Sequence, residues 1–136
     1  MPRVIVFGTF DVLHQGHHNF FRQAKKYGEL FVVIARDRNV KKIKGQKPTF
    51  SEKTRRNSVA KLKNAEAVYL GNLSDPYKII EKIKPDVIAL GYDQNSFTKN
   101  LEAELKKRKI SAKIIRLKPY QPHKYKSSRI KKAGRT

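Results

Sequence analysis

The 136-residue chain carries 32 lysines and arginines against 11 aspartates and glutamates, which gives a formal net charge of +21 at pH 7. Its length favours one domain over residues 1–136, with a basic tail from about residue 131, and its lack of cysteine excludes disulfides and thiolate metal sites. The longest wholly apolar run, residues 30–35, is too short to cross a bilayer, and the first strand is expected within five residues of Met1, so we expect no signal peptide and a cytoplasmic protein.

Short apolar runs alternate with amphipathic stretches along the chain. We expect strands at residues 3–7, 30–35, 67–70, 87–90 and 113–117. We expect helices at residues 15–27, 52–63, 76–84 and about 97–108, with a short helix after Ser127. This alternation predicts the α/β class: a Rossmann-like single domain with a five-stranded parallel sheet, right-handed crossovers and helices on both faces.

The turn after the first strand reads Gly8-Thr9-Phe10-Asp11-Val12-Leu13-His14-Gln15-Gly16-His17. Gly8 lets the backbone leave the strand freely and lets a phosphate approach closely, and Gly16 offers the same freedom. His14 and His17 lie three residues apart, so they share a face if the helix has begun at His14, and each can donate a ring N–H to phosphate oxygens. Because this turn joins the carboxyl end of a strand to a helix N-terminus, it predicts a polyphosphate site.

Two other interpretations of the histidines compete with this one, a metal site and ordinary helix capping. A metal site has little support, because the chain has no cysteine and no acid stands at a zinc-like spacing from the pair. His18 adjoins the pair but meets no requirement of a phosphate site. We expect His18 to be a solvated or packing residue.

The string from Gly8 to Asp11, followed by His14-x-Gly16-His17, resembles the HxGH nucleotidyltransferase superfamily in its small cytidylyltransferase-like branch. The resemblance extends from residue 4 to about residue 130 and implies the strand order 3-2-1-4-5, with the first strand central. It implies that His14 and His17 are catalytic and that Asp11 lies on the side of the acceptor. The implied contacts to the nucleotide and its phosphates in this turn are Gly8, Thr9, Phe10 and Gly16.

A lysine-rich segment, residues 40–48, follows the second strand. A loop at this end of the sheet faces the ligand, so a flexible segment of this kind can close over a triphosphate; the alternative is a merely solvated loop. The resemblance implies that Lys42 or Lys44 contacts the phosphates, and we favour Lys44 as catalytic because flexible Gly45 follows it. Asp37 stands where the family has an acid, which binds the acceptor or holds the loop.

The next helix is expected to begin at Ser51, with the charge of Glu52 in its first turn suited to the helix dipole. The residues from Glu52 to Arg55 resemble the ExxR pattern of the family. This resemblance implies that Arg55 points into the site and binds the phosphate of the acceptor or nucleotide, a task suited to its forked donors.

The fourth strand ends in Gly91-Tyr92-Asp93-Gln94, an ending similar to that of archaeal FAD synthases. The family uses this position for part of the nucleotide base pocket. Gly91 permits close approach, Asp93 and Gln94 offer hydrogen-bonding groups to a base edge, and Tyr92 is one of several aromatics that could flank a flat ring. The alternative is that these residues cap the following helix. For Asn95 capping is as good an interpretation as nucleotide binding, and for Asp93 it is a poorer one.

The segment after the last strand matches the second phosphate element of the superfamily, a hydroxyl-rich turn at a helix N-terminus followed by a basic residue. The hydroxyls and backbone N–H groups of Ser127 and Ser128 would hold the β and γ phosphates, with Arg129 as a candidate cation. The arginine-threonine-x-glycine lead-in of glycerol-phosphate cytidylyltransferases is replaced here by residues 120–124. This departure weakens the transfer of their acceptor and nucleotide specificity to this chain and leaves the phosphate chemistry untouched.

The resemblance implies attack of an acceptor phosphate oxygen on the α-phosphorus of a nucleoside triphosphate, with release of pyrophosphate. Magnesium or another divalent ion would be bound through the triphosphate, and no metal ligand is assigned to the protein. ATP with FMN, giving FAD, is the favoured substrate pair. The rival is CTP with glycerol 3-phosphate or a similar small polyol phosphate.

The positive charge exceeds what one nucleotide requires. A basic RNA-binding protein on a nucleotide-binding fold is therefore the non-enzyme alternative, and nucleic acid is a secondary candidate partner of the enzyme. Against RNA binding, the lysines are scattered through every element and no RNA-recognition aromatic motif is present. Relatives are often dimers, so a homodimer is also expected as one form of the protein.

Overall fold

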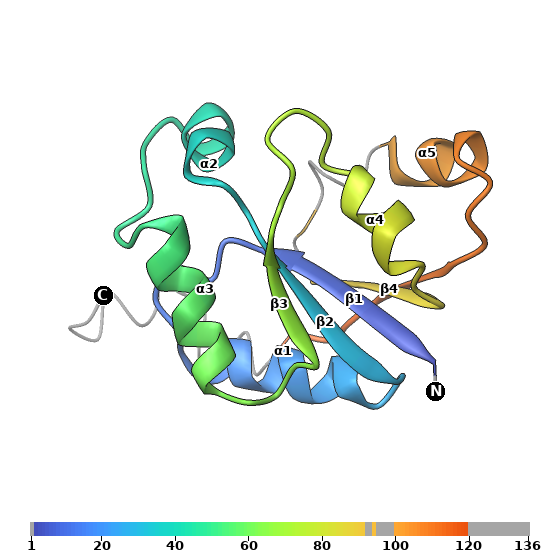
Figure 1. Cartoon of the computed structure of the whole chain (residues 1–136). Coiled ribbons are helices and arrows are strands. Elements are labelled where there is room, and N and C mark those ends of the chain that lie inside the picture. Colours follow the sequence, from blue (N-terminus) through green and yellow to red (C-terminus); the bar gives the residue numbers. More distant parts are fainter. Residues whose placement is uncertain (1, 92–93, 95–99, 120–136) are drawn as a thin grey trace.

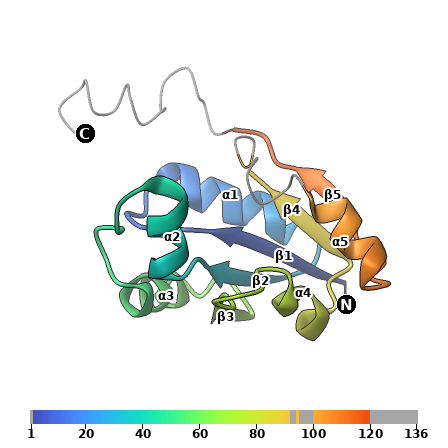
Figure 2. The ribbon, with the colours of Figure 1, turned by 90° about the horizontal axis from the view of Figure 1, so that it is seen from above.

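The computed structural model describes residues 2–91, 94 and 100–119, and these form one parallel sheet of five strands in the order β3-β2-β1-β4-β5. Figure 2 shows the strands side by side in this order. The strands are β1 Arg3–Gly8, β2 Glu29–Ile34, β3 Ala67–Leu70, β4 Val87–Leu90 and β5 Lys113–Arg116. The predicted fold class and strand order are confirmed.

Helices cover both faces of the sheet (Figure 1). They are α1 Gln15–Lys25, α2 Asp37–Lys44, α3 Glu52–Lys61, α4 Lys78–Ile83 and α5 Leu101–Lys107. Because successive residues of a strand point to opposite faces, Val4 and Val6 pack with α1 and α3, whereas Ile5 and Phe7 pack with α4 and α5. Two apolar cores therefore fix the central strand from above and below.

The lysine-rich segment after β2 differs from the flexible loop expected there, because residues 37–44 form the helix α2. Asp37 lies in its first turn, where a negative charge suits the helix dipole, and lysines occupy its last turn. Gly45 ends the helix in a left-handed conformation with φ of 85°, which glycine adopts without strain. In Figure 2, α2 lies beyond the carboxyl ends of the strands.

Arg108 connects α4 and α5, the two short helices on one face of the sheet. Its guanidinium pairs with Asp75 before α4, with Glu81 on α4 and with Glu104 on α5. It also lies over the ring of Tyr77. These charges raise the pKa of Arg108, led by the hydrogen bond to Asp75. The cluster belongs to the scaffold, on the opposite face from α1.

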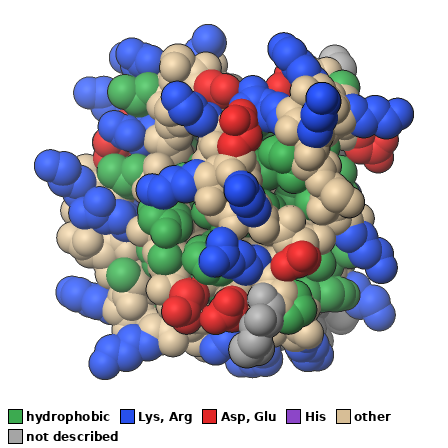
Figure 3. Space-filling view, turned by 45° about the vertical axis from the view of Figure 1, so that its right-hand side comes forward, with side chains coloured by type: hydrophobic (Ala, Val, Ile, Leu, Met, Phe, Trp, Pro, Cys, Tyr) green, Lys and Arg blue, Asp and Glu red, His purple; other side chains and the backbone are tan. Residues whose placement is uncertain are grey.

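The surface is basic over the whole face drawn in Figure 3, where lysine and arginine side chains are spread between small apolar areas. Within the described part of the chain, every ion pair comes from Arg36, Arg55 or Arg108, and none from a lysine. The lysines therefore leave their charge on the surface, whereas several acids are paired with buried or partly buried arginines. None of the helices in the described ranges is long and apolar enough to cross a membrane.

Candidate functional site

The two motif histidines form the N-terminal cap of α1. Nδ1 of His14 accepts a hydrogen bond from the Gly16 amide at 3.0 Å, and Nδ1 of His17 accepts one from the His14 amide at 3.3 Å. The two rings are stacked, with their centroids 4.0 Å apart. Since each Nδ1 acts as an acceptor, each neutral ring carries its proton on Nε2. The cap therefore provides two Nε2–H donors side by side at the end of β1.

Both imidazoles are neutral at pH 7. Burial is the main cause that lowers the pKa of His17 to about 4, with smaller contributions from the neighbouring His14 and His18. The pKa of His14 is also lowered, first by burial and then by His18. A neutral ring still donates one N–H, so these residues can bind a phosphate oxygen without first taking up a proton.

Each glycine of the motif makes room for one aromatic ring. A Cβ on Gly16 would lie 2.8 Å from Cε1 of His14, so only glycine lets the His14 ring lie over the helix end. A Cβ on Gly8 would lie 2.6 Å from a ring carbon of Phe10. These glycines therefore have a steric role in the motif, and their expected role in phosphate approach stays a prediction.

Phe10 lies beneath the histidines and not on the surface that faces a ligand. Its side chain is 5% exposed, and its ring meets the edge of His17 at a centroid distance of 5.4 Å. Its backbone has a positive φ of 49°, which costs energy in a residue other than glycine. This differs from the expectation that Phe10 contacts the nucleotide, because burial leaves its ring to support His17.

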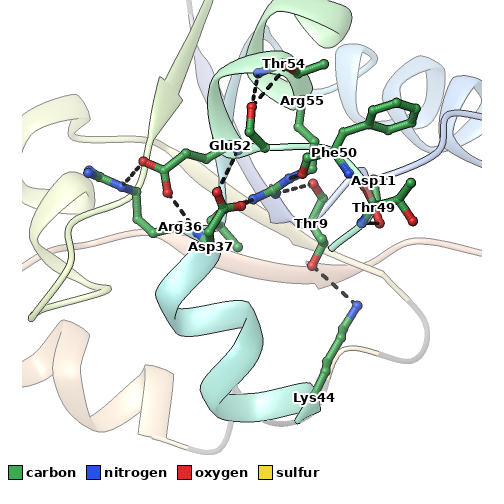
Figure 4. Close-up of polar contacts among 12 residues, drawn as sticks. Thr9, Asp11, Arg36, Asp37, Lys44, Thr49, Phe50, Glu52, Thr54 and Arg55 are labelled. Atoms are coloured by element: carbon green, nitrogen blue, oxygen red, sulfur yellow. Dashed lines mark hydrogen bonds and ion pairs between the residues drawn. The ribbon is translucent and has the colours of Figure 1, made fainter. Parts of the chain in front are cut away.

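Lys44 is brought to the motif turn by α2. Its Nζ lies 3.4 Å from Oγ1 of Thr9, and its side chain is otherwise exposed (Figure 4). Among the described residues, Lys42 makes no comparable contact with the turn. The structure thus brings Thr9 and Lys44 together from two segments, and the contact of Lys44 with phosphate stays a prediction.

Of the residues expected to bind the acceptor, Arg55 is buried and Asp11 is hydrogen-bonded to backbone amides. Arg55 has 0% exposure, and its guanidinium donates to backbone carbonyls and to Asp37. The two carboxylate oxygens of Asp11 accept the amides of Thr49 and Phe50 at 2.6 and 2.8 Å. A buried guanidinium cannot reach a phosphate in solution, so the expectation that Arg55 points at the acceptor is at odds with this structure.

Asp37 joins α2 to α3, and its expected contact with the acceptor stays a prediction. Its Oδ1 accepts from Arg55 at 2.6 Å and its Oδ2 accepts from the Glu52 amide at 3.1 Å. Burial alone would raise the pKa of Asp37, but the hydrogen bond from Arg55, the amide of Glu52 and the positive charges nearby bring it below its usual value. Asp37 therefore stays ionised and joined to α3.

A family model described as cytidylyltransferase-like matches residues 5–133. The chain belongs to the cytidylyltransferase-like family. It is 47% identical to a protein named FAD synthase from Aciduliprofundum boonei, over 88% of this chain and 80% of that protein. It is also 47% identical to a FAD synthase from Ferroglobus placidus, over 87% of this chain and 77% of that protein. The recognition made from the HxGH string, and the expected nucleotidyltransferase class, are thereby confirmed.

A solved structure shares this cytidylyltransferase-like fold. It is described as a lipopolysaccharide core biosynthesis protein from Thermoplasma volcanium, with a TM-score of 0.82 and 38% sequence identity. The match covers 89% of this chain and 99% of that one. The names of these relatives therefore differ, although all of them match most of this chain.

The turn after β4, which the family uses for the nucleotide base, is held at both of its ends. Oε1 of Gln94 accepts the Gly91 amide at 2.7 Å, and Nε2 of Gln94 donates to the Phe7 carbonyl of β1 at 2.8 Å. The side-chain amide of Gln94, expected to bind the nucleotide, thus joins β4 to β1. Tyr92 and Asp93 lie outside the described residues, so their proposed contacts stay predictions.

Arg116 holds the same turn from the end of β5, a role that the sequence patterns did not indicate. Its Nη1 donates to the carbonyls of Gly91 and Gln94 at 2.8 and 2.7 Å. It stands beside Leu90 in the pairing of β4 with β5. The sequence signal available for this role was a charged residue at the carboxyl end of the last strand. Arg116 fixes the far side of the turn.

The second phosphate element, with Ser127, Ser128 and Arg129, also lies outside the described residues and stays a prediction. In the described ranges, no group of three or more histidines, aspartates or glutamates is placed to hold a metal ion. Near the motif turn, Asp11 and Asp37 are each engaged by protein donors.

Proposed function

We propose that this protein transfers the AMP group of ATP to FMN, giving FAD and pyrophosphate. The observation that carries the chemistry is the stacked pair of His14 and His17, with both Nδ1 atoms occupied and both Nε2–H groups left as donors. Two relatives that are 47% identical over most of the chain, both named FAD synthase, support the choice of substrates.

The reaction joins a phosphate oxygen of FMN to the α-phosphorus of ATP and breaks the bond from that phosphorus to the bridging oxygen of the leaving pyrophosphate. A phosphate monoester is already anionic near neutral pH, so no protein nucleophile or strong base is needed. Negative charge grows on the leaving group, and donors fixed in advance stabilise such charge without reorganising. We assign this task to His14 and His17.

The neutral state of the histidines fits this task. A donor that keeps its own proton throughout stabilises the leaving group by hydrogen bonding and not by proton transfer. Lys44 adds a positive charge, since its Nζ contacts Thr9 in the same turn. Ser127, Ser128 and Arg129 are proposed to bind the β and γ phosphates from the other end of the chain, on the resemblance to the family.

Magnesium, when bound to the triphosphate, would neutralise part of its charge and polarise the phosphoryl oxygens. In this proposal the protein's own groups bind and orient the phosphates around it. The cytoplasmic location and the homodimer expected from the sequence stay predictions, as does RNA binding by the basic surface.

The assignment is tested by incubating the full-length protein and magnesium with FMN and each of ATP, CTP, GTP and UTP. FAD and pyrophosphate formed in equal amounts with ATP alone support the proposal. A parallel set replaces FMN by glycerol 3-phosphate. Pyrophosphate release with CTP in that set, and no FAD in the first, would replace adenylyl transfer to FMN by cytidylyl transfer to a small polyol phosphate.

A further inference from the structure

Arg55 connects three segments that meet at the carboxyl end of the sheet. Its Nε donates to the Phe50 carbonyl at 3.0 Å, its Nη1 to the Thr9 carbonyl at 2.7 Å and its Nη2 to the Ala35 carbonyl at 2.8 Å. These carbonyls belong to the segment before α3, the turn after β1 and the end of β2. Figure 4 shows the guanidinium beside Thr9 and Phe50, with Asp37 also next to it.

The geometry explains why arginine stands here. A fully buried charge is costly unless it is paired and hydrogen-bonded, and here one carboxylate and three carbonyls provide that compensation. The planar fork of arginine can reach acceptors in several directions at once. The single ammonium of lysine cannot span the same three carbonyls.

Thr9 connects this arrangement to the phosphate side of the site. Its carbonyl accepts from Arg55, while its hydroxyl is the contact of Lys44. Arg55 therefore fixes the backbone of the residue against which Lys44 is placed. A shift of Thr9 would move both the motif turn and the lysine.

Asp11 makes the second connection between the same two segments. It accepts the amide of Phe50, and the carbonyl of Phe50 accepts from Arg55. Phe50 is thus held on both sides of its backbone, once from the turn after β1 and once from α3. We call Arg55, Asp11 and their backbone partners the loop clamp.

We propose that Arg55 and Asp11 are positioning residues of this enzyme: the loop clamp sets Thr9 and Lys44 for the triphosphate, and neither Arg55 nor Asp11 binds the acceptor. The inference rests on the proposed function for its substrates. Its structural part rests on the complete burial of Arg55 and on the two amides that occupy the Asp11 carboxylate.

The decisive variant is Arg55→Lys, which keeps the charge beside Asp37 but cannot hold all three carbonyls. Misplacement of groups around a reacting phosphate lowers turnover, so we expect kcat to fall by about 100-fold. No acceptor contact is removed, so the dissociation constant of FMN should stay within about threefold. FMN binding is measured without ATP, from the change in flavin fluorescence.

Asp11→Asn is the second variant, because Asp11 is only half-buried and the amide side chain keeps one of the two acceptor oxygens. It should show the same pattern with a smaller fall in kcat. Amide hydrogen exchange at Thr49 and Phe50 provides a readout independent of activity, and both variants should accelerate it. Arg56→Lys is the matched control, since Arg56 is next on α3 and makes no side-chain hydrogen bond or ion pair among the described residues.

A rise of more than about tenfold in the FMN dissociation constant of both variants, with unchanged exchange at Thr49 and Phe50, would overturn the inference, because it would show direct acceptor contacts. If the wild-type protein forms no FAD, the proposed function fails, yet the exchange measurement still decides on the loop clamp. Accelerated exchange in Arg55→Lys or Asp11→Asn then supports it, and unchanged exchange in both overturns it.

Discussion

Asp37 and Glu52 cap each other's helices. The Asp37 amide at the start of α2 donates to Oε1 of Glu52 at 2.8 Å, and the Glu52 amide at the start of α3 donates to Oδ2 of Asp37 at 3.1 Å. Each carboxylate therefore lies at the positive end of the other helix as well as its own. Arg36 and Arg55 bind the remaining oxygens. These reciprocal hydrogen bonds between Asp37 and Glu52 set the orientation of α2, and with it the position of Lys44.

Glu52→Ala should weaken this junction. It leaves the first amide of α2 without its acceptor and Arg36 without its carboxylate, so the free energy of unfolding should fall by about 1 to 2 kcal/mol, as for loss of a helix cap. Denaturant unfolding measures the change. Lys53→Ala, at the next position of α3, is the control and should stay within about 0.5 kcal/mol of the wild type. Equal losses in the two variants would show that the reciprocal caps contribute nothing.

Gly8→Ala should disturb the site through Phe10. The new methyl group would lie 2.6 Å from the Phe10 ring, and the ring, buried against His17, has little room to move. We expect a loss of about 1 to 3 kcal/mol in unfolding free energy, as for an overpacked core. Gly71→Ala is the control because its nearest neighbours would lie at an ordinary 3.5 Å. An unfolding curve of Gly8→Ala that matches that of Gly71→Ala would contradict the packing described here.

The pKa of His17 predicts a loss of stability in acid. Its pKa is about 4 in the folded protein and 6.5 in the unfolded chain, so only the unfolded state takes up this proton as pH falls between those values. His17 therefore costs no stability above 6.5 and progressively more from 6.5 down to about 4, after which its effect levels off. His14 acts in the same direction.

The check is a nuclear magnetic resonance titration of the His17 ring, together with unfolding free energies measured across the same range. The wild type should lose more stability than His17→Asn between neutral pH and about pH 4. A His17 midpoint near the usual value of 6.5, or the same pH dependence in both proteins, would show that the ring is not buried as the structure has it.

The sheet and the motif turn were accessible from the sequence because their signals are local. Apolar runs define the strands, and the spacing of His14 and His17 places both imidazoles at one helix end. The choice of Lys44 rested on a flexible Gly45, whereas Gly45 ends α2 in a left-handed conformation. The structure brings Lys44 to Thr9.

The partners of Arg55 and Arg116 were not accessible in this way. Arg55 binds the backbone carbonyls of Thr9, Ala35 and Phe50. Every residue has a backbone carbonyl, so the residue types of these three segments do not indicate that their carbonyls converge on one arginine. The resemblance to an ExxR pattern placed Arg55 near the site but predicted that it points at a ligand, whereas its side chain is buried. The acceptors of Arg116 are also backbone carbonyls, at a turn whose residue types indicated base recognition or a helix cap.

The imidazoles of His14 and His17 are central to the proposed chemistry, because they are the groups assigned to stabilise the leaving pyrophosphate. His14→Asn tests this assignment most directly, because asparagine is a good N-cap for α1 but lacks the imidazole Nε2–H, and His18→Asn is the control next to it. The measurement is the rate of pyrophosphate release with saturating ATP and FMN. We predict a loss on the order of 100- to 1,000-fold for His14→Asn and little change for His18→Asn. A His14→Asn enzyme that releases pyrophosphate at the wild-type rate would contradict the assignment.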